Sequence, residues 1–167
     1  MSYCGVRWLS RFLMSFSLLV TPACQRGNSD AASRAFHRGD YETAVRLWQH
    51  AATLGRADAQ CKLGRIYLNG LGVRQDFTEA RKWFELAASQ GSPCAFSPLG
   101  YIYRSGKGVP PDYVEAMKWY NLASAVGDSR EMRETLAWQM TKDDLATAEH
   151  LAAEWRIRHS IRGRSQR

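Results

Sequence analysis

The sequence lacks the short motifs that mark most catalytic, nucleotide-binding and metal-binding sites. No glycine-rich stretch has the third glycine of a dinucleotide-binding loop, and the Gly106-Lys107 pair is not followed by the serine or threonine of a phosphate-binding loop. There is no Gly-x-Ser-x-Gly elbow, no Ser-x-x-Lys motif and no Cys-x-x-Cys pair, and the four histidines do not have zinc-ligand spacing. We therefore expect a protein without catalytic residues, without a bound metal and without a cofactor.

The sequence also lacks an apolar run long enough to span a bilayer. The N-terminal run, residues 12–20, is about half of the ~20 residues that a transmembrane helix needs. Arg7 and Arg11 precede this run and a small-residue cleavage site follows it, so residues 1–23 resemble a signal peptide. Three interpretations stand: ordinary secretion, a lipoprotein with lipid on Cys24, or an uncleaved anchor or misassigned start. We expect an exported protein in the periplasm or at the envelope.

The central part of the chain lacks an excess of either charge, although the formal net charge is +7. The excess lies at the two ends, in Arg7, Arg11, Arg156, Arg158, Arg162, Arg164 and Arg167, and 16 basic residues then balance 16 acidic ones. Residues 158–167 are either a solvated, disordered tail or a tether to the anionic headgroups of a membrane surface. We expect no nucleic-acid partner, because no aromatic residue of this tail offers a stacking platform.

What the sequence does contain is an internal repeat. Residues 59–94 and 95–130 align at a constant offset of 36 without a gap, and 16 of the 36 aligned positions are identical. A fixed period of roughly 20–50 residues is typical of stacked repeat proteins. The repeated structural positions are Leu63, Gly64, Tyr67, Gly70, Gly72 and Trp83 in the first copy, and Leu99, Gly100, Tyr103, Gly106, Gly108 and Trp119 in the second.

Each copy predicts two helices joined by a glycine-containing loop. Leu63, Ile66 and Tyr67 lie at i, i+3 and i+4, which places them on one face of a helix, and a second apolar face follows the loop. Asp76 and its counterpart Asp112 are expected to cap the second helices.

A glycine inside a helix costs about 1 kcal/mol relative to alanine. We therefore expect a neighbouring helix to press against Gly64 and Gly100, which lie inside the predicted first helices. Trp83 and Trp119 are expected to fill the space between successive hairpins.

The pattern A-x-x-x-L-G-x-x-Y-x-x-G-x-G-V-x-x-D-x-x-E-A-x-x-W-x-x-x-A begins at Ala59 and again at Ala95. It resembles the Sel1-like repeat, a variant of the tetratricopeptide repeat with a longer inter-helix loop. The resemblance implies an all-α fold, a right-handed α/α solenoid of about four helical hairpins. The implied segments are a linker at 24–30, a tetratricopeptide-like hairpin at 31–58, full Sel1-like repeats at 59–94 and 95–128, and a degenerate capping hairpin at 129–157.

The cysteines do not follow the period of the repeat. One disulfide per repeat, as in the cysteine-rich branch of this family, is therefore not expected. Cys61 and Cys94 form either a bridge in an oxidising compartment or a pair of small, unpaired helix residues. The unpaired interpretation is favoured because free cysteine is commonly buried, and the sequence does not give the Cα separation that a bridge requires.

The resemblance implies a non-enzymatic module that binds a protein or peptide segment in a concave groove lined by the first helices. The implied groove residues are Lys62, Arg65, Asn69, Tyr101, Arg104 and Ser105, with Phe36 and His37 from the first hairpin. Arg65 and Arg104 are suited to pair with carboxylates, and Tyr101 to cover an apolar side chain. The alternative, implied by activities proposed for some relatives, is a cell-wall-related hydrolase, a weak β-lactamase or peptidoglycan-active enzyme, on the same scaffold.

Overall fold

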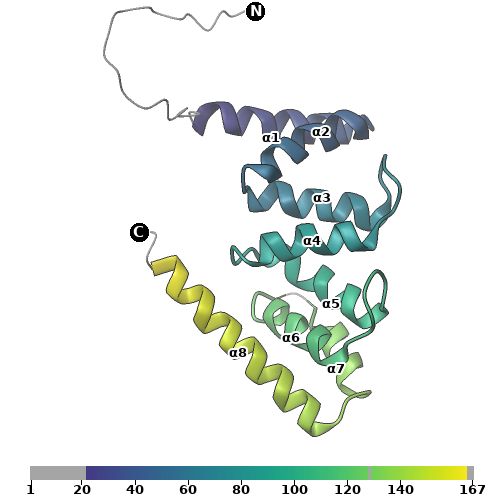
Figure 1. Ribbon diagram of the computed structural model, residues 1–167, viewed down its shortest axis with the longest axis vertical. Coiled ribbons are helices and arrows are strands. Elements are labelled where there is room, and N and C mark those ends of the chain that lie inside the picture. Colours follow the sequence, from purple (N-terminus) through teal and green to yellow (C-terminus); the bar gives the residue numbers. More distant parts are fainter. Residues whose placement is uncertain (1–21, 128, 165–167) are drawn as a thin grey trace, which may run out of the picture.

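The described chain is a stack of helices that pack in sequential pairs (Figure 1). The structure, a computed structural model, describes residues 22–127 and 129–164, with side chains described between residues 30 and 160. The elements are α1 (Pro22–His37), α2 (Tyr41–Thr53), α3 (Ala57–Asn69), α4 (Phe77–Ala88), a 3-10 turn η1 (Pro93–Ala95), α5 (Phe96–Ser105), α6 (Tyr113–Ser124), α7 (Arg130–Ala137) and α8 (Lys142–Arg164). The predicted all-α fold of stacked helical pairs is confirmed.

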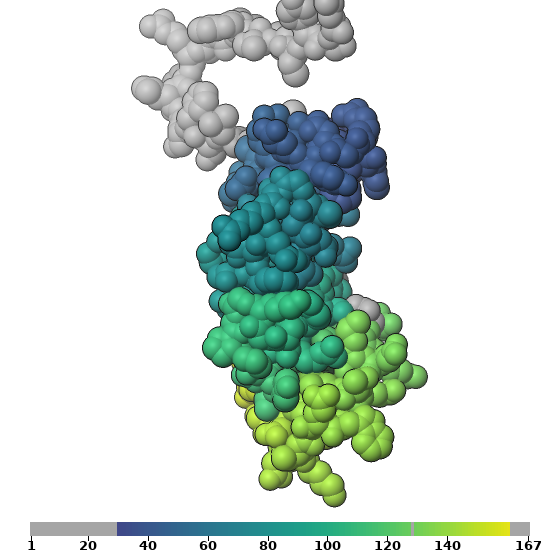
Figure 2. Space-filling view, turned by 90° about the vertical axis from the view of Figure 1, so that its right-hand side faces the viewer, coloured from purple at the N-terminus to yellow at the C-terminus, as the bar shows by residue number. Residues whose placement is uncertain are grey.

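Successive pairs lie on one another as layers, from the N-terminal to the C-terminal end of the described chain (Figure 2). Helix α2 packs on α3, and α4 packs on α5, so each pair contacts the next through its second helix. At the C-terminal end, α7 and α8 both pack against α6. Each pair therefore buries its apolar side chains against its neighbours, as expected of a repeat protein.

Glycines inside the first helices mark the closest approach within each pair. A Cβ atom at Gly64 would lie 2.7 Å from the ring of Phe84, and one at Gly100 would lie 2.5 Å from the ring of Tyr120. The expected close contact is thus confirmed, and the rings that press on the glycines are those of Phe84 and Tyr120. Trp83 is partly buried against the core cluster of α1 to α3, and Trp119 is buried beside the rings of Phe96 and Trp155.

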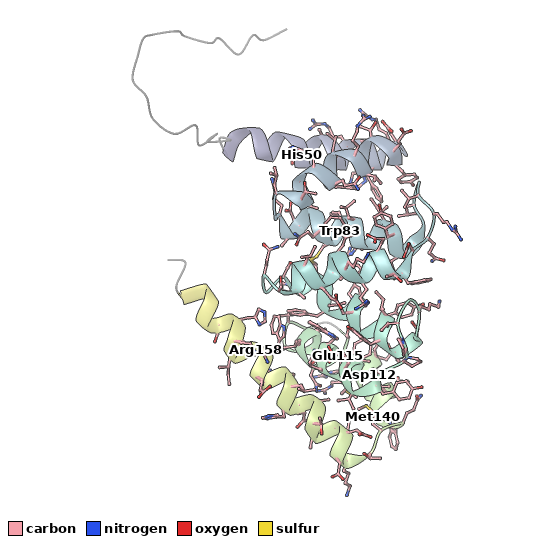
Figure 3. The ribbon with its side chains drawn as sticks, in the orientation of Figure 1. His50, Trp83, Asp112, Glu115, Met140 and Arg158 are labelled. Atoms are coloured by element: carbon pink, nitrogen blue, oxygen red, sulfur yellow. A yellow bond between two sulfur atoms is a disulfide. The ribbon has the colours of Figure 1, made fainter. Side chains whose placement is uncertain are left out.

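Aspartates begin the second helices of both full repeats, as predicted. The Asp76 carboxylate accepts hydrogen bonds from the backbone N–H groups of Thr78 and Glu79, both at 2.9 Å. The Asp112 carboxylate accepts one from the N–H of Glu115 at 2.8 Å, at the start of α6 (Figure 3). These caps satisfy N–H groups that have no partner within the helix.

The loop of each full repeat lies against the preceding hairpin. Gly108, with φ of +74°, comes so close to the start of α4 that a Cβ atom there would lie 2.8 Å from the backbone nitrogen of Thr78. The Thr78 hydroxyl donates to the Gly108 carbonyl at 3.4 Å. The long loop therefore adds a second contact between consecutive pairs.

Two segments expected to be irregular are helical. Residues 24–30, predicted to be a linker, belong to α1, which begins at Pro22; proline suits a first helical position because its missing N–H needs no partner there. Extending an existing helix adds one hydrogen bond for each residue fixed, so the polar residues 24–30 join the helix that residues 31–37 already form.

At the other end, α8 reaches Arg164, so most of the predicted disordered tail at 158–167 is helical. The side chains of Glu154 and Arg158 pair at 3.6 Å, and the rings of Trp155 and His159 stack at 3.7 Å, and both contacts support the helix one turn beyond the core. The predicted signal peptide, apart from Pro22 and Ala23, and residues 165–167 lie outside the described residues. No described helix is both long enough and apolar enough to span a membrane.

A disulfide joins Cys61 to Cys94, which corrects the favoured expectation that the two thiols are unpaired. Cys61 lies in α3 and Cys94 in η1, and their Cα atoms are 6.3 Å apart, within the range that a disulfide spans. The stacking of one repeat on the next brings the two residues together although 33 positions separate them. The bridge therefore links α3 to the 3-10 turn that precedes α5.

Candidate functional site

Three of the predicted binding residues form an exposed stripe on α3. Lys62, Arg65 and Asn69 lie at i, i+3 and i+7, whereas Leu63 and Ile66 on the opposite face are buried in the core. The Asn69 amide donates a hydrogen bond to the backbone carbonyl of Arg65 at 2.9 Å. The core face fixes the helix, so the stripe faces outward from a rigid element.

The corresponding part of α5 presents an aromatic side chain with a cation beside it. Tyr101 occupies the same repeat position as Arg65 and is half-buried. The Lys107 ammonium donates to the Tyr101 hydroxyl at 3.0 Å and lies 5.1 Å from the centre of the Phe77 ring. A cation held over aromatic rings in this way is weakly attracted to their faces.

The other predicted residues of α5 and α1 differ in exposure. Ser105 is exposed and donates to the Ile102 carbonyl at 3.3 Å, whereas Arg104 is half-buried. Phe36 packs against the rings of Tyr41 and Trp48 at 5.2 and 5.4 Å, so it belongs to the N-terminal core, and His37 is exposed beside it.

Four cations on α3, α5 and the following loop have no acidic partner among the side chains that the structure describes. We define Lys62, Arg65, Arg104 and Lys107 as the basic face. None of them forms an ion pair with a carboxylate among residues 30–127 and 129–160. By contrast, Lys82 and Lys118 on the second helices pair with glutamates three residues before them.

Lys107, which the sequence pattern placed only in a loop, was not among the predicted binding residues. Its position after a repeat glycine indicated a turn and nothing more. The signal that could have identified it is its distance of six residues from Tyr101, which lets a long side chain fold back from the loop.

A polar cluster between α4 and α5 fixes the two helices relative to each other. The Tyr103 hydroxyl donates to Glu85 Oε1 at 3.0 Å, and Arg81 Nη1 donates to the same oxygen at 2.8 Å. Burial, followed by the negative charge of Glu85, raises the pKa of Tyr103 to about 12. The hydroxyl is therefore protonated at neutral pH and acts as a structural donor, which holds α5 and its binding residues in place.

The described residues contain no group of three or more histidine, cysteine, aspartate or glutamate side chains placed to hold a metal ion. The carboxylates that the hydrogen-bond geometry locates lie mainly at helix starts or in ion pairs along the helices. The arrangement offers recognition chemistry, with cationic donors beside an aromatic surface.

Comparison with known proteins identifies the repeat. The family model described as Sel1 repeat matches residues 34–55, 57–92 and 99–128. The first match falls in the hairpin at 31–58, which was predicted to be tetratricopeptide-like.

Two solved structures are similar over most of the described chain. The first is c5321, described as a protective antigen of uropathogenic Escherichia coli strains with an SLR fold; the identity is 32% and the TM-score 0.72, over 78% of this chain and 29% of that one. The second is a Sel1 repeat protein from Oxalobacter formigenes, with 26% identity and a TM-score of 0.60, over 77% of this chain and 54% of that one. The chain thus spans between about a third and about half of these proteins. A search of curated proteins found no match.

Proposed function

We propose, on the premise that this chain belongs to the Sel1 repeat family, that it is a non-enzymatic interaction module which holds an acidic protein or peptide segment. Sel1 repeats form scaffolds that typically serve protein interactions. The segment lies across the exposed surfaces of the first helices, where equivalent positions of consecutive repeats follow one another along the stack.

The observation that carries this proposal is the basic face. Four cations without acidic partners in the described part of the chain are suited to carboxylates, and the two arginines can form paired hydrogen bonds with them. Tyr101 lies beside Lys107 with its ring half-buried and offers a flat surface for an apolar side chain. These features favour a partner in which acidic and apolar residues alternate.

The setting that we propose is the bacterial envelope. The disulfide between Cys61 and Cys94 supports an oxidising compartment, since disulfides persist mainly in exported proteins. Membrane association through lipid on Cys24 or through the arginines of α8 is part of this proposal. If lipid on Cys24 holds the protein in the membrane fraction, Cys24→Ser is expected to release it. If the variant stays in the membrane fraction, the arginines of α8 are the anchor.

The test is affinity capture from an envelope extract, followed by mass spectrometry. Lys62→Glu combined with Arg65→Glu reverses two charges on exposed side chains of α3. We expect this variant to lose the proteins that the parent chain retains. Arg46→Glu with Arg130→Glu is the matched control, because it makes the same change of charge on exposed residues of α2 and α7.

The melting temperature of both variants separates binding from folding. The proposal predicts that both variants melt with the parent and that only the α3 variant loses its partner. Equal capture by the α3 variant and the parent would contradict the proposal, as would equal loss from both variants.

A further inference from the structure

A cavity lies at the C-terminal end of the stack, apart from the basic face. Helices α7 and α8 both pack against α6, and between them are two adjoining cavities of about 220 Å³ and about 360 Å³. The two share Asn121 of α6, Arg133 of α7 and Glu149 of α8. One site is thus lined by polar side chains from all three helices.

One of these shared side chains, the Asn121 amide, has a buried hydrogen-bond donor that the described protein does not use, whereas Glu149 is exposed and Arg133 half-buried at the mouth of the site. The Asn121 Nδ2 atom is buried and has no hydrogen-bond partner. Neither Arg133 nor Glu149 forms an ion pair with another side chain between residues 30 and 160, residue 128 aside. A buried donor without an acceptor costs free energy, so a ligand that supplies an acceptor oxygen would be favoured here.

The charges around the cavity are balanced, which limits the class of ligand. Arg133 and Arg156 offer guanidinium donors, and Glu134 and Glu149 offer carboxylate acceptors. A simple anion would meet repulsion from the glutamates. A group that carries a carboxylate and an N–H donor close together satisfies both kinds of side chain.

The rest of the lining and the volume limit the size of that group. Met117, Ala137 and Leu145 supply an apolar wall to the smaller cavity. Sites for drug-sized ligands usually measure about 300–1,000 Å³, so the smaller cavity, at about 220 Å³, suits one short apolar side chain.

We propose that this cavity binds an α-carboxylate with its adjacent N–H donor and a small aliphatic side chain. Arg133, Arg156 and the Asn121 amide hold the carboxylate, and Glu149 accepts the N–H. Two sources share this chemistry: the C-terminal residue of a peptide and a free amino acid. The site uses α6, α7 and α8, so it is independent of the basic face on α3 and α5.

The test is a titration of the full chain, followed by ¹H–¹⁵N correlation spectra. The probes are acetyl-Gly-Gly-Ala with a free carboxylate, the same peptide as its C-terminal amide, and L-alanine. We expect saturable shifts of signals from α6, α7 and α8 with the free acid and at least tenfold weaker binding of the amide. Stronger binding of L-alanine than of the free-acid peptide would identify a free amino acid as the ligand, and the reverse order a peptide end.

Variants of the cavity test the assigned roles. Arg133→Gln is expected to weaken binding at least tenfold, and Arg130→Gln, an exposed neighbour on α7 outside the lining, to leave it unchanged. Glu149→Gln, on a different helix, gives a second measurement should Arg133→Gln fail to fold, and it too is expected to weaken binding. The proposal is overturned if neither L-alanine nor the free-acid peptide gives saturable shifts, if the amide binds as well as the acid, or if the folded cavity variants bind like the parent.

Discussion

Removal of the Cys61–Cys94 disulfide should destabilise the stack by an amount that follows from its position. The bridge joins residues 33 positions apart and so closes a loop of that order in the unfolded chain. In the chain-entropy description, a loop of this length contributes about 3–4 kcal/mol to the free energy of unfolding. Domains of this kind are stable by only about 5–15 kcal/mol, so the loss is a large fraction of the total.

The assay is urea denaturation followed by far-ultraviolet circular dichroism, with and without reductant. A parent chain with Cys4→Ser and Cys24→Ser removes the other two thiols. We expect reductant to lower the unfolding free energy of this parent by about 3–4 kcal/mol. Cys61→Ala with Cys94→Ala should start at the lower value and not respond to reductant.

Two results would refute this reasoning. One is the labelling of two free thiols in the unreduced native parent, which would show that no bridge forms. The other is a midpoint that reductant leaves unchanged in the bridged parent, which would show that the bridge does not restrict the unfolded chain.

Three further substitutions test the packing between repeats. Tyr120→Phe should leave the urea midpoint unchanged or raise stability by about 1 kcal/mol, because the buried hydroxyl has no partner and Phe84 fills the equivalent position; a clear loss would contradict this. The raised pKa of Tyr103 predicts that the contribution of its hydroxyl to stability is complete below about pH 10 and is lost as pH rises towards about 12. Tyr103→Phe should therefore make the unfolding free energy less dependent on pH over that interval, and parallel pH profiles of variant and parent would contradict this. Trp119→Ala should lower the free energy of unfolding by about 3–5 kcal/mol in chemical denaturation, and Trp83→Ala should lower it less, because the Trp83 ring is only partly buried. The opposite order would be inconsistent with the packing.

The repeated positions allowed the sequence to predict much of the fold. Two copies at a fixed offset require the same local structure twice, so the helices, the loops and the capping role of Asp76 and Asp112 follow from pattern and turn chemistry. The glycines at 64 and 100 correctly indicated a close approach. The repeat pattern did not assign the ring that fills that space, because Trp83 and Phe84 are both large aromatic residues and only the orientation of α4 in the stack decides which one faces Gly64.

Features that depend on contacts between repeats were predicted less well. The Cys61–Cys94 bridge joins positions that are not equivalent in the repeat, so the period gave no sign of it. The cavity beside Asn121 arises where α7 and α8 pack on α6 without following the repeat, and only the packing of that end creates it. The residues of the α3 stripe were implied by the family resemblance, whereas the contact of Lys107 with Tyr101 needed the folded loop.

The most direct test of the central claim, that the first helices hold a partner, is photocrosslinking within the native envelope. A photoreactive amino acid replaces Arg65 on α3 in one protein and Arg46 on α2 in a control, and both positions are exposed. We predict one covalent adduct of defined mass from position 65 after illumination and none from position 46. Adducts from position 46 alone, or the same adducts from both, would contradict the account.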